Sequence, residues 1–183
     1  LETGDFWLDG GAMMGSVPKV LWSKTNPPDA DNRIQLAMRC LLVDDGKNVV
    51  LIETGIGDKN SDKFIEMFKI EQHKNALSSA LSDSGYSTES ITHIVLTHLH
   101  FDHAGGATKI NIKNKIVPSF PNAQFYISER NWEAGLNPNK RDQASYLKEN
   151  YLTLKESGIL KIIPENSKIV DGVSTYVVHG HTH

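Results

Sequence analysis

The chain has little that would cross-link it or anchor it in a membrane. Its 183 residues include a single cysteine, Cys40, which excludes an intrachain disulfide. No stretch approaches the roughly 20 consecutive apolar residues that a transmembrane helix requires. Cys40 lies in an apolar, extended segment, and this setting predicts a buried, unreactive thiol.

The chain also lacks an excess of charge of either sign. Nineteen Lys and Arg residues against 22 Asp and Glu residues give a formal net charge of −3, and the lysines are scattered. This balance argues against nucleic acid or an anionic membrane surface as a partner. No basic segment followed by an apolar one opens the chain, so we expect a cytoplasmic protein. Because the first residue is not Met, the sequence leaves open whether a leader peptide was removed earlier.

The patterning predicts one mixed α/β domain over residues 1–183. Apolar and other side chains alternate over 34–42, which is typical of a strand. The Asp45-Gly46 pair then predicts a tight turn into a second strand at 49–52, so that the two form a hairpin.

Helices and strands alternate through the rest of the chain. Ser61 is a candidate N-cap for a helix that carries Phe64 and Phe68, and Gly85 ends a helix predicted over 75–84. We predict further strands over 93–97, 124–127, 159–163 and 173–178, and a third helix over 142–156 that Gly158 ends. Such interleaving indicates an α/β class.

The most informative segment is a histidine cluster after the predicted strand at 93–97. Residues 97–106 read THLHFDHAGG. Residues two apart in an extended chain project to the same side, so His98 and His100 can converge on one ion. Asp102 and His103 follow where the chain must turn, and they can face a second ion. Imidazole and carboxylate ligands suit Zn²⁺, and Fe or Mn would also fit.

This motif resembles the HxHxDH signature of the metallo-β-lactamase superfamily. The resemblance extends over essentially the whole chain, and it implies an αββα sandwich with the metal ligands in loops at one edge of its two sheets. Residues 180–182 resemble a GHT segment of the family, whose histidine is here His181. The resemblance therefore implies two zinc ions per complete domain. His98, His100 and His181 would bind the first ion, and Asp102 and His103 the second.

The chain departs from the family pattern in two places. Glu53 stands where the family usually has Asp, which leaves its role open. The family pattern also continues beyond the GHT segment with a bridging Asp and a final His, and neither is present here. We therefore expect a C-terminally truncated domain that lacks its last strands and helix, with the second metal site empty, weakly occupied or completed by a neighbouring chain.

The other histidines have plainer interpretations. We predict that His73 is solvated and that His93 is a hydrogen-bonded packing residue. His179 and His183 flank His181, and their roles stay open. A purely structural zinc site is the simplest alternative for the cluster, but such sites usually use cysteines.

The predicted chemistry is hydrolysis of a small molecule by a metal-bound hydroxide. Two adjacent cations lower the pKa of a shared water, and Asp102 can also steer a proton to the leaving group. Residues 9–19 and 144–150 resemble the lactonase and organophosphate-hydrolase branch of the superfamily, which favours a lactone or similar ester. Packing is the plainer interpretation of Met13, Met14, Tyr146 and Leu147 in these segments.

Other functions remain as alternatives. Hydrolysis of a thioester (as in glyoxalase II), a β-lactam or a phosphotriester would use the same motif. A nuclease is disfavoured by the charge pattern, and a homodimer is left open. The non-enzyme alternative is an inactive half-domain fragment.

Overall fold

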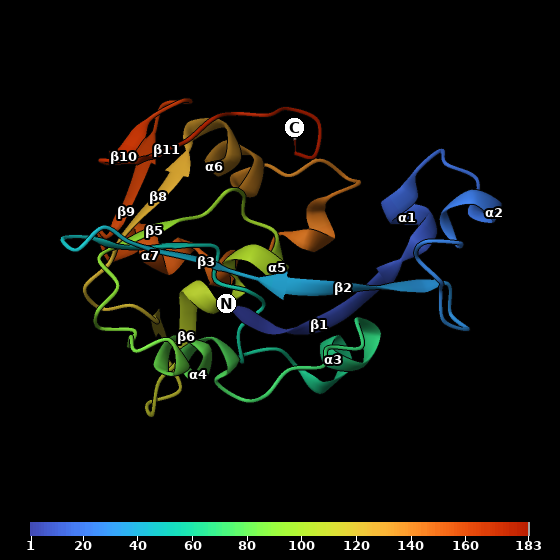
Figure 1. Ribbon diagram of the computed structural model, residues 1–183, viewed down its shortest axis with the longest axis horizontal. Helices are drawn as coiled ribbons and strands as arrows, with labels where there is room; N and C mark the ends of the chain where they lie inside the picture. Colours follow the sequence, from blue (N-terminus) through green and yellow to red (C-terminus); the bar gives the residue numbers. More distant parts are fainter. Residues whose placement is uncertain (183) are drawn as a thin grey trace.

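A five-stranded sheet forms the centre of the computed structural model, which describes residues 1–182. Its strand order is β3-β4-β5-β8-β9 (Figure 1). β3 pairs antiparallel with β4, and the other neighbours are parallel. The strands are β3 (Leu41–Asp44), β4 (Val49–Ile52), β5 (His93–Val95), β8 (Gln124–Ser128) and β9 (Leu160–Ile163). The predicted mixed α/β class is confirmed.

The hairpin predicted at Asp45-Gly46 is present, but it is shorter than expected. Asp45 Oδ1 accepts the backbone N–H groups of Lys47 and Asn48, and Gly46 has a φ of +83°, so the turn reverses directly into β4. The first part of the predicted strand instead belongs to β2 (Arg33–Arg39). The chain leaves β2 at Cys40 and enters β3 one residue later.

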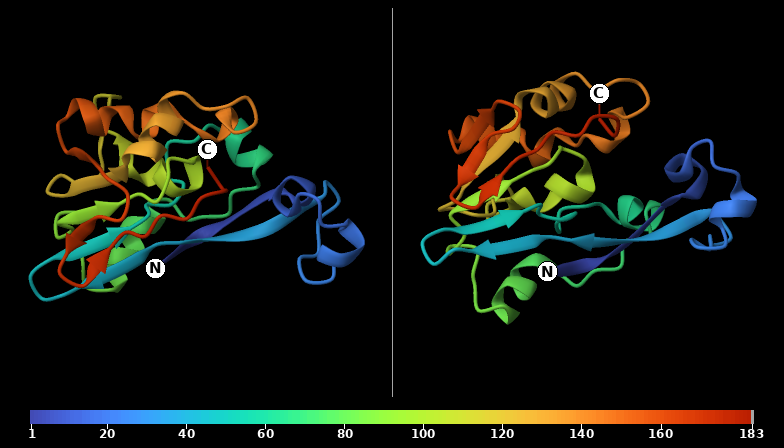
Figure 2. Two further views of the ribbon diagram at one scale, coloured as in Figure 1. Left: turned by 90° about the horizontal axis from the view of Figure 1, so that it is seen from above. Right: turned by 45° about the horizontal axis from the view of Figure 1, so that its top comes forward.

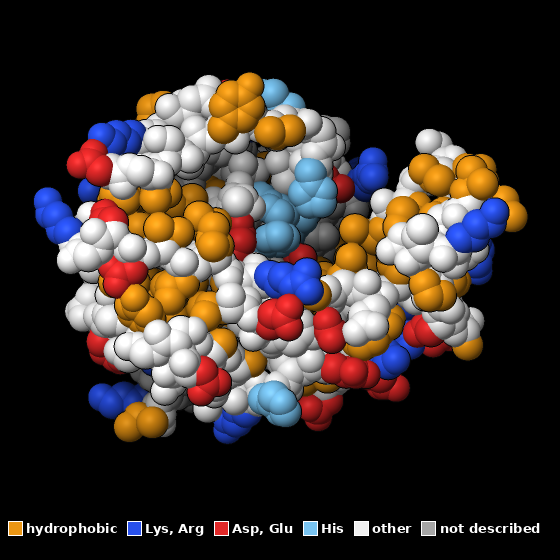
Figure 3. All heavy atoms as spheres, viewed as in Figure 1, with side chains coloured by type: hydrophobic (Ala, Val, Ile, Leu, Met, Phe, Trp, Pro, Cys, Tyr) orange, Lys and Arg blue, Asp and Glu red, His pale blue; other side chains and the backbone are white. Residues whose placement is uncertain are grey.

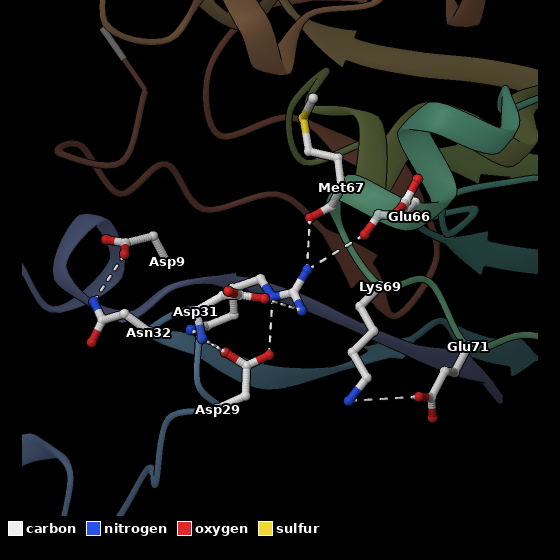
Figure 4. Close-up of polar contacts among 9 residues, drawn as sticks. Asp9, Asp29, Asp31, Asn32, Glu66, Met67, Lys69 and Glu71 are labelled. Carbon is white, nitrogen blue, oxygen red and sulfur yellow. Dashed lines mark hydrogen bonds and ion pairs between the residues drawn. The ribbon is translucent and has the colours of Figure 1, made fainter.

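β2 pairs with β1 (Glu2–Asp9) to form a two-stranded arm that leaves the body of the molecule (Figures 1 and 2). The arm carries two short helices at its far end, α1 (Gly10–Met14) and α2 (Lys19–Trp22). Figure 4 shows polar contacts along the arm, including the Asp9–Asn32 hydrogen bond of 2.9 Å. Arg33 ties the arm to the body, because its Nη1 donates to the carbonyl oxygens of Glu66 and Met67 at the end of α3 (Asp62–Met67).

The main core lies on one face of the five-stranded sheet. Cross-strand neighbours in the middle of the sheet form a single buried row: Leu51, Ile94, Phe125 and Leu160. The same core contains side chains from α4 (Ala76–Asp83), α6 (Glu129–Leu136) and α7 (Leu152–Glu156). These helices therefore cover the face on which that row lies.

The other sheets of residues 1–182 are two-stranded. They are β1-β2, β6 (Thr108–Ile110) with β7 (Ile116–Pro118), and β10 (Lys168–Val170) with β11 (Val173–Ser174). The strand predicted over 173–178 is thus confined to its first two residues. In the described residues, these small sheets are the only ones besides the five-stranded sheet.

The helix predicted over 142–156 is wrong in its first two-thirds. Only α7 is α-helical there, and short 3₁₀ turns at Gln143–Ser145 and Lys148–Asn150 precede it. Asn139 explains the start, because its Oδ1 accepts the N–H groups of Arg141 and Asp142 and so favours a turn. The sequence patterns also did not predict α6, whose N-cap Ser128 accepts a hydrogen bond from the backbone N–H of Asn131.

The predicted helix cap at Ser61, the helix end at Gly85 and the burial of Cys40 are confirmed. Ser61 caps α3, and Gly85 follows α4 with a φ of +84°. Cys40 is 3% exposed, and burial raises the pKa of its thiol to about 12. None of the helices in the described part of the chain is long and apolar enough to span a membrane.

Candidate metal centre

The histidine cluster begins at the carboxyl end of β5, in the middle of the sheet. The chain stays extended through His98 and His100 and then turns into α5 (Phe101–Ala104). Leu99 is fully buried in the core, while the His98 and His100 rings meet on the other side of the chain. The expected alternation therefore holds, and it brings these two imidazoles together.

His181 completes a group of three imidazoles. His98 Nε2 lies 3.1 Å from His100 Nδ1 and 3.2 Å from His181 Nε2. One nitrogen from each ring can be chosen so that all three lie within 4.8 Å of one another. The three histidines arrive from two segments that are far apart in the sequence. Figure 3 shows histidine side chains gathered in a hollow near the centre of one face.

The electrostatics keep His98 and His100 neutral. Burial, together with the neighbouring His103, His100 and His181 rings, lowers the pKa of His98 to about 2. Burial is also the main reason that the pKa of His100 is lowered to about 4. Each neutral ring offers one nitrogen lone pair.

One buried atom of the cluster has no hydrogen-bond partner among the described residues. It is Nε2 of His100, a residue that is 9% exposed; within residues 1–182, Oε2 of the neighbouring Glu53 is likewise buried without a hydrogen bond. A buried polar atom without a partner is costly. Converging neutral imidazoles with a spare lone pair are the donor set that zinc and similar divalent ions take. The three residues therefore fit a metal ion.

Asp102 and His103 lie beside this group and contact each other. His103 Nε2 is 3.2 Å from Asp102 Oδ2, and the His98 and His103 ring centroids are 4.1 Å apart. Burial opposes charge on His103, but the carboxylates of Asp102 and Glu53 outweigh it and raise its pKa to about 10. Burial would raise the pKa of Asp102, yet His103 holds it below the usual value. Within residues 1–182 no third ligand joins this pair.

Glu53 is the acidic neighbour whose role the sequence left open. Its carboxylate is buried between two parts of the motif: Oε1 accepts the Thr97 N–H at 3.0 Å, and Oε2 lies 3.2 Å from His103 Nδ1. The backbone of Glu53 has a φ of +70°, which non-glycine residues rarely adopt. In the sequence, Glu53 could be noticed because it lies directly after a predicted strand and before Thr54-Gly55.

The two glycines after the motif allow its backbone to lie against the loop after β4. A Cβ atom on Gly105 would lie 2.1 Å from the carbonyl oxygen of Ile56, and one on Gly106 would lie 2.2 Å from that of Thr54. Thr54 also donates its hydroxyl to the His103 carbonyl at 2.8 Å. The loop therefore holds the motif by direct backbone contact.

The remaining histidines lie apart from the cluster. His93 contacts the Thr92 hydroxyl at 2.8 Å and stacks on Tyr126, as expected of a packing residue. His73 and His179 are exposed. His179 lies outside the group of three, and His183 lies outside the described residues.

Two further residues adjoin the cluster. Tyr146 is buried, in line with the packing interpretation, and its ring centroid lies 4.8 Å from that of His100. Asn131 lies on the first turn of α6, and its side-chain amide bonds Thr97 and Thr182. Nothing in the sequence had singled out Asn131.

Comparison with known proteins gives a family match over most of the chain. The model of the metallo-beta-lactamase superfamily matches residues 38–183. An N-acyl homoserine lactonase of Bacillus cereus is 27% identical over 160 residues, which cover 82% of this chain and 57% of that protein.

Solved structures give a similar picture. A probable metal-dependent hydrolase from Staphylococcus aureus is 28% identical with a TM-score of 0.84, over 95% of this chain and 61% of that one. A quorum-quenching N-acyl homoserine lactone lactonase, 22% identical, shares the fold with a TM-score of 0.70 over 100% of this chain and 64% of that one. The chain thus spans about three fifths of the length of these relatives.

Proposed function

The chain belongs to the metallo-beta-lactamase superfamily, and from that membership we propose that it acts as a metal-dependent hydrolase on a lactone or another small ester-like substrate. The observation that carries the proposal is the convergence of His98, His100 and His181. The similarity to a protein named as an N-acyl homoserine lactonase supports the substrate class, and the similarity to a probable metal-dependent hydrolase supports the reaction class.

In this proposal the three histidines hold the first metal ion, and Asp102 and His103 contribute to a second. Zinc is the expected metal, with iron or manganese as the alternatives that these ligands also accept. A bound divalent ion supplies Lewis acidity, which polarises a carbonyl group and makes water more acidic.

Neighbouring side chains orient the proposed ligands and influence their protonation. The Glu53 carboxylate lies against Nδ1 of His103. The other ring nitrogen, Nε2, therefore faces Asp102 and the cluster. A carboxylate behind a ligating histidine fixes the ring and increases its basicity. The lowered pKa values of His98 and His100 keep both rings uncharged at neutral pH, so each ring has one nitrogen lone pair to offer a metal ion.

Asp102 is the residue that we propose for proton transfer. Hydrolysis of a lactone adds water across the ring C–O bond, so the acyl carbon gains a hydroxyl and the ring oxygen leaves with a proton. Asp102 is an ionised carboxylate 20% exposed at its side chain. It can accept a proton from the attacking water and return it to the leaving oxygen.

A substrate panel on metal-free and zinc-loaded protein tests this function. We expect zinc-dependent hydrolysis of a lactone, with slower or no turnover of a thioester, a β-lactam and a phosphotriester. His100→Ala should abolish the activity, whereas His73→Ala, which changes an exposed histidine, should not. Faster hydrolysis of another substrate in the panel would overturn the proposed substrate class and assign the protein to a different branch of the superfamily. Absence of turnover with every substrate, despite bound zinc, would favour the inactive-fragment alternative.

A further inference from the structure

Asn131 connects the two segments that bring the three histidines together. Its Nδ2 donates to the carbonyl oxygen of Thr97 at 2.9 Å, and its Oδ1 accepts the hydroxyl of Thr182 at 2.8 Å. Thr97 directly precedes His98, and Thr182 directly follows His181. One side-chain amide therefore joins the residues that flank the two ligands.

Asn131 is itself held in place by the start of α6. Ser128, the N-cap of that helix, accepts the backbone N–H of Asn131 at 3.3 Å and its Nδ2 at 3.0 Å. The amide thus faces Thr97 with its donor end and Thr182 with its acceptor end. An aspartate in the same place would put a carboxylate oxygen against the Thr97 carbonyl, because it has no donor when ionised.

The segment that carries His181 has few other attachments. Tyr176, Val178 and His179 are exposed, and Gly180 has a φ of +125°. Among the described residues, the hydrogen bonds from 178–182 to the rest of the chain are two. One joins His181 to His98, and the other joins Thr182 to Asn131. The histidine contact would be replaced on metal binding, which leaves the Thr182–Asn131 bond to place the segment.

We propose that Asn131 is a positioning residue, which holds His181 against His98 and His100 and so presets the third ligand of the metal site. The proposal rests on the metal site proposed above. Without the clasp formed by Asn131 and Thr182, His181 samples other positions, and binding of the ion must order the segment at an entropic cost. Changes in such supporting residues typically reduce metal affinity about 10-fold to 100-fold.

Zinc affinity measured by competition with a chromophoric chelator is the first test. Asn131→Leu and Thr182→Val keep the approximate size of each side chain, and each removes the hydrogen bond between residues 131 and 182. We expect each to weaken zinc binding by at least about 10-fold, and Thr182→Ser to restore it to near the wild-type value. Glu133→Ala, which changes an exposed residue on the same helix, is the matched control and should leave the affinity unchanged.

A second readout uses the metal-free protein. Hydrogen exchange in residues 178–182 should be faster in Asn131→Leu and Thr182→Val than in the wild type, while the midpoint of thermal unfolding stays nearly the same. Wild-type zinc affinity and wild-type exchange in both variants would overturn the proposal. If the wild type binds no zinc, the proposed metal site fails, and the exchange measurement still decides whether Asn131 holds the segment.

Discussion

Glu53 Oε2 lies 3.2 Å from Nδ1 of His103, while the other oxygen of the same carboxylate accepts the N–H of Thr97. One buried side chain therefore supports the histidine motif at its first residue and at its last histidine. The backbone of Glu53 has a φ of +70°, and such a strained conformation persists only where contacts such as the hydrogen bond to the Thr97 N–H fix the residue.

Replacing this carboxylate should destabilise the protein even without metal. Glu53→Ala leaves the Thr97 N–H without its acceptor and His103 without its ion pair. We expect the free energy of unfolding to fall by about 1–3 kcal/mol, measured by urea denaturation with chelator present. Glu53→Gln, which keeps an oxygen for the Thr97 N–H, should lose less. Equal losses in the two variants would show that the hydrogen bond to Thr97 contributes nothing.

The His103 ion pairs predict a pH dependence for the metal-free protein. The carboxylates of Asp102 and Glu53 raise the pKa of His103 from the usual 6.5 to about 10, so the folded state holds this proton more tightly than the unfolded chain. The stabilisation is complete below about pH 6.5 and is lost as the pH rises toward 10.

Urea unfolding at a series of pH values checks this dependence. The free energy of unfolding should decrease between pH 6.5 and 10, and the decrease should be shallower in Glu53→Gln, because one of the two carboxylates is gone. A flat profile in the wild type across this interval would rule out the raised pKa.

The contact of Gly105 with Ile56 predicts a severe steric effect. Gly105 has an ordinary helical φ of −60°, so Gly105→Ala adds no backbone strain of its own. The new Cβ would nevertheless lie 2.1 Å from a backbone oxygen, and the loop must move. We expect a loss of about 3 kcal/mol or more, measured by thermal and urea unfolding.

A matched substitution separates the clash from a general effect of alanine. Gly11→Ala, in helix α1, would bring its Cβ no closer than 3.0 Å to the exposed Asp9 side chain. We expect it to be nearly neutral. If Gly105→Ala were tolerated equally well, the loop after β4 would not be in tight contact with the motif.

Cys40 should resist alkylation in the folded protein. Burial raises the pKa of its thiol from 9.0 to about 12, which reduces the reactive thiolate about a thousand-fold at pH 8. The measurement is the rate of iodoacetamide labelling in buffer and in concentrated urea. Rapid labelling under native conditions would mean that the junction between β2 and β3 opens.

Sequence patterns predicted the parts of the fold that depend on neighbouring residues. The turn at Asp45-Gly46 and the Ser61 cap are local features, and both are present in the structure. The alternation over 34–42 is extended chain as predicted, but it is divided between β2 and β3, which belong to different sheets. The pairing of His98 with His100 was also predictable, because residues two apart in an extended chain share a side.

Features that depend on distant contacts were not predictable in this way. The helix predicted over 142–156 begins instead with two 3₁₀ turns, which follow a turn formed by the Asn139 side chain, and Tyr146 lies buried between them. His181 could be assigned only through resemblance to a family. The Asn131–Thr182 bond leaves no periodic signal in the sequence, since it joins two polar side chains from separate segments.

The central claim is that His98, His100 and His181 form one metal site, and the most direct test is a zinc titration of the metal-free protein and three variants. His98→Ala and His181→Ala each remove one of three converging imidazoles, whereas His179→Ala removes an exposed imidazole two residues from His181. The account predicts that both cluster variants lose the tightest zinc site and that His179→Ala keeps it. Zinc binding that survives in His181→Ala with unchanged affinity would contradict the account.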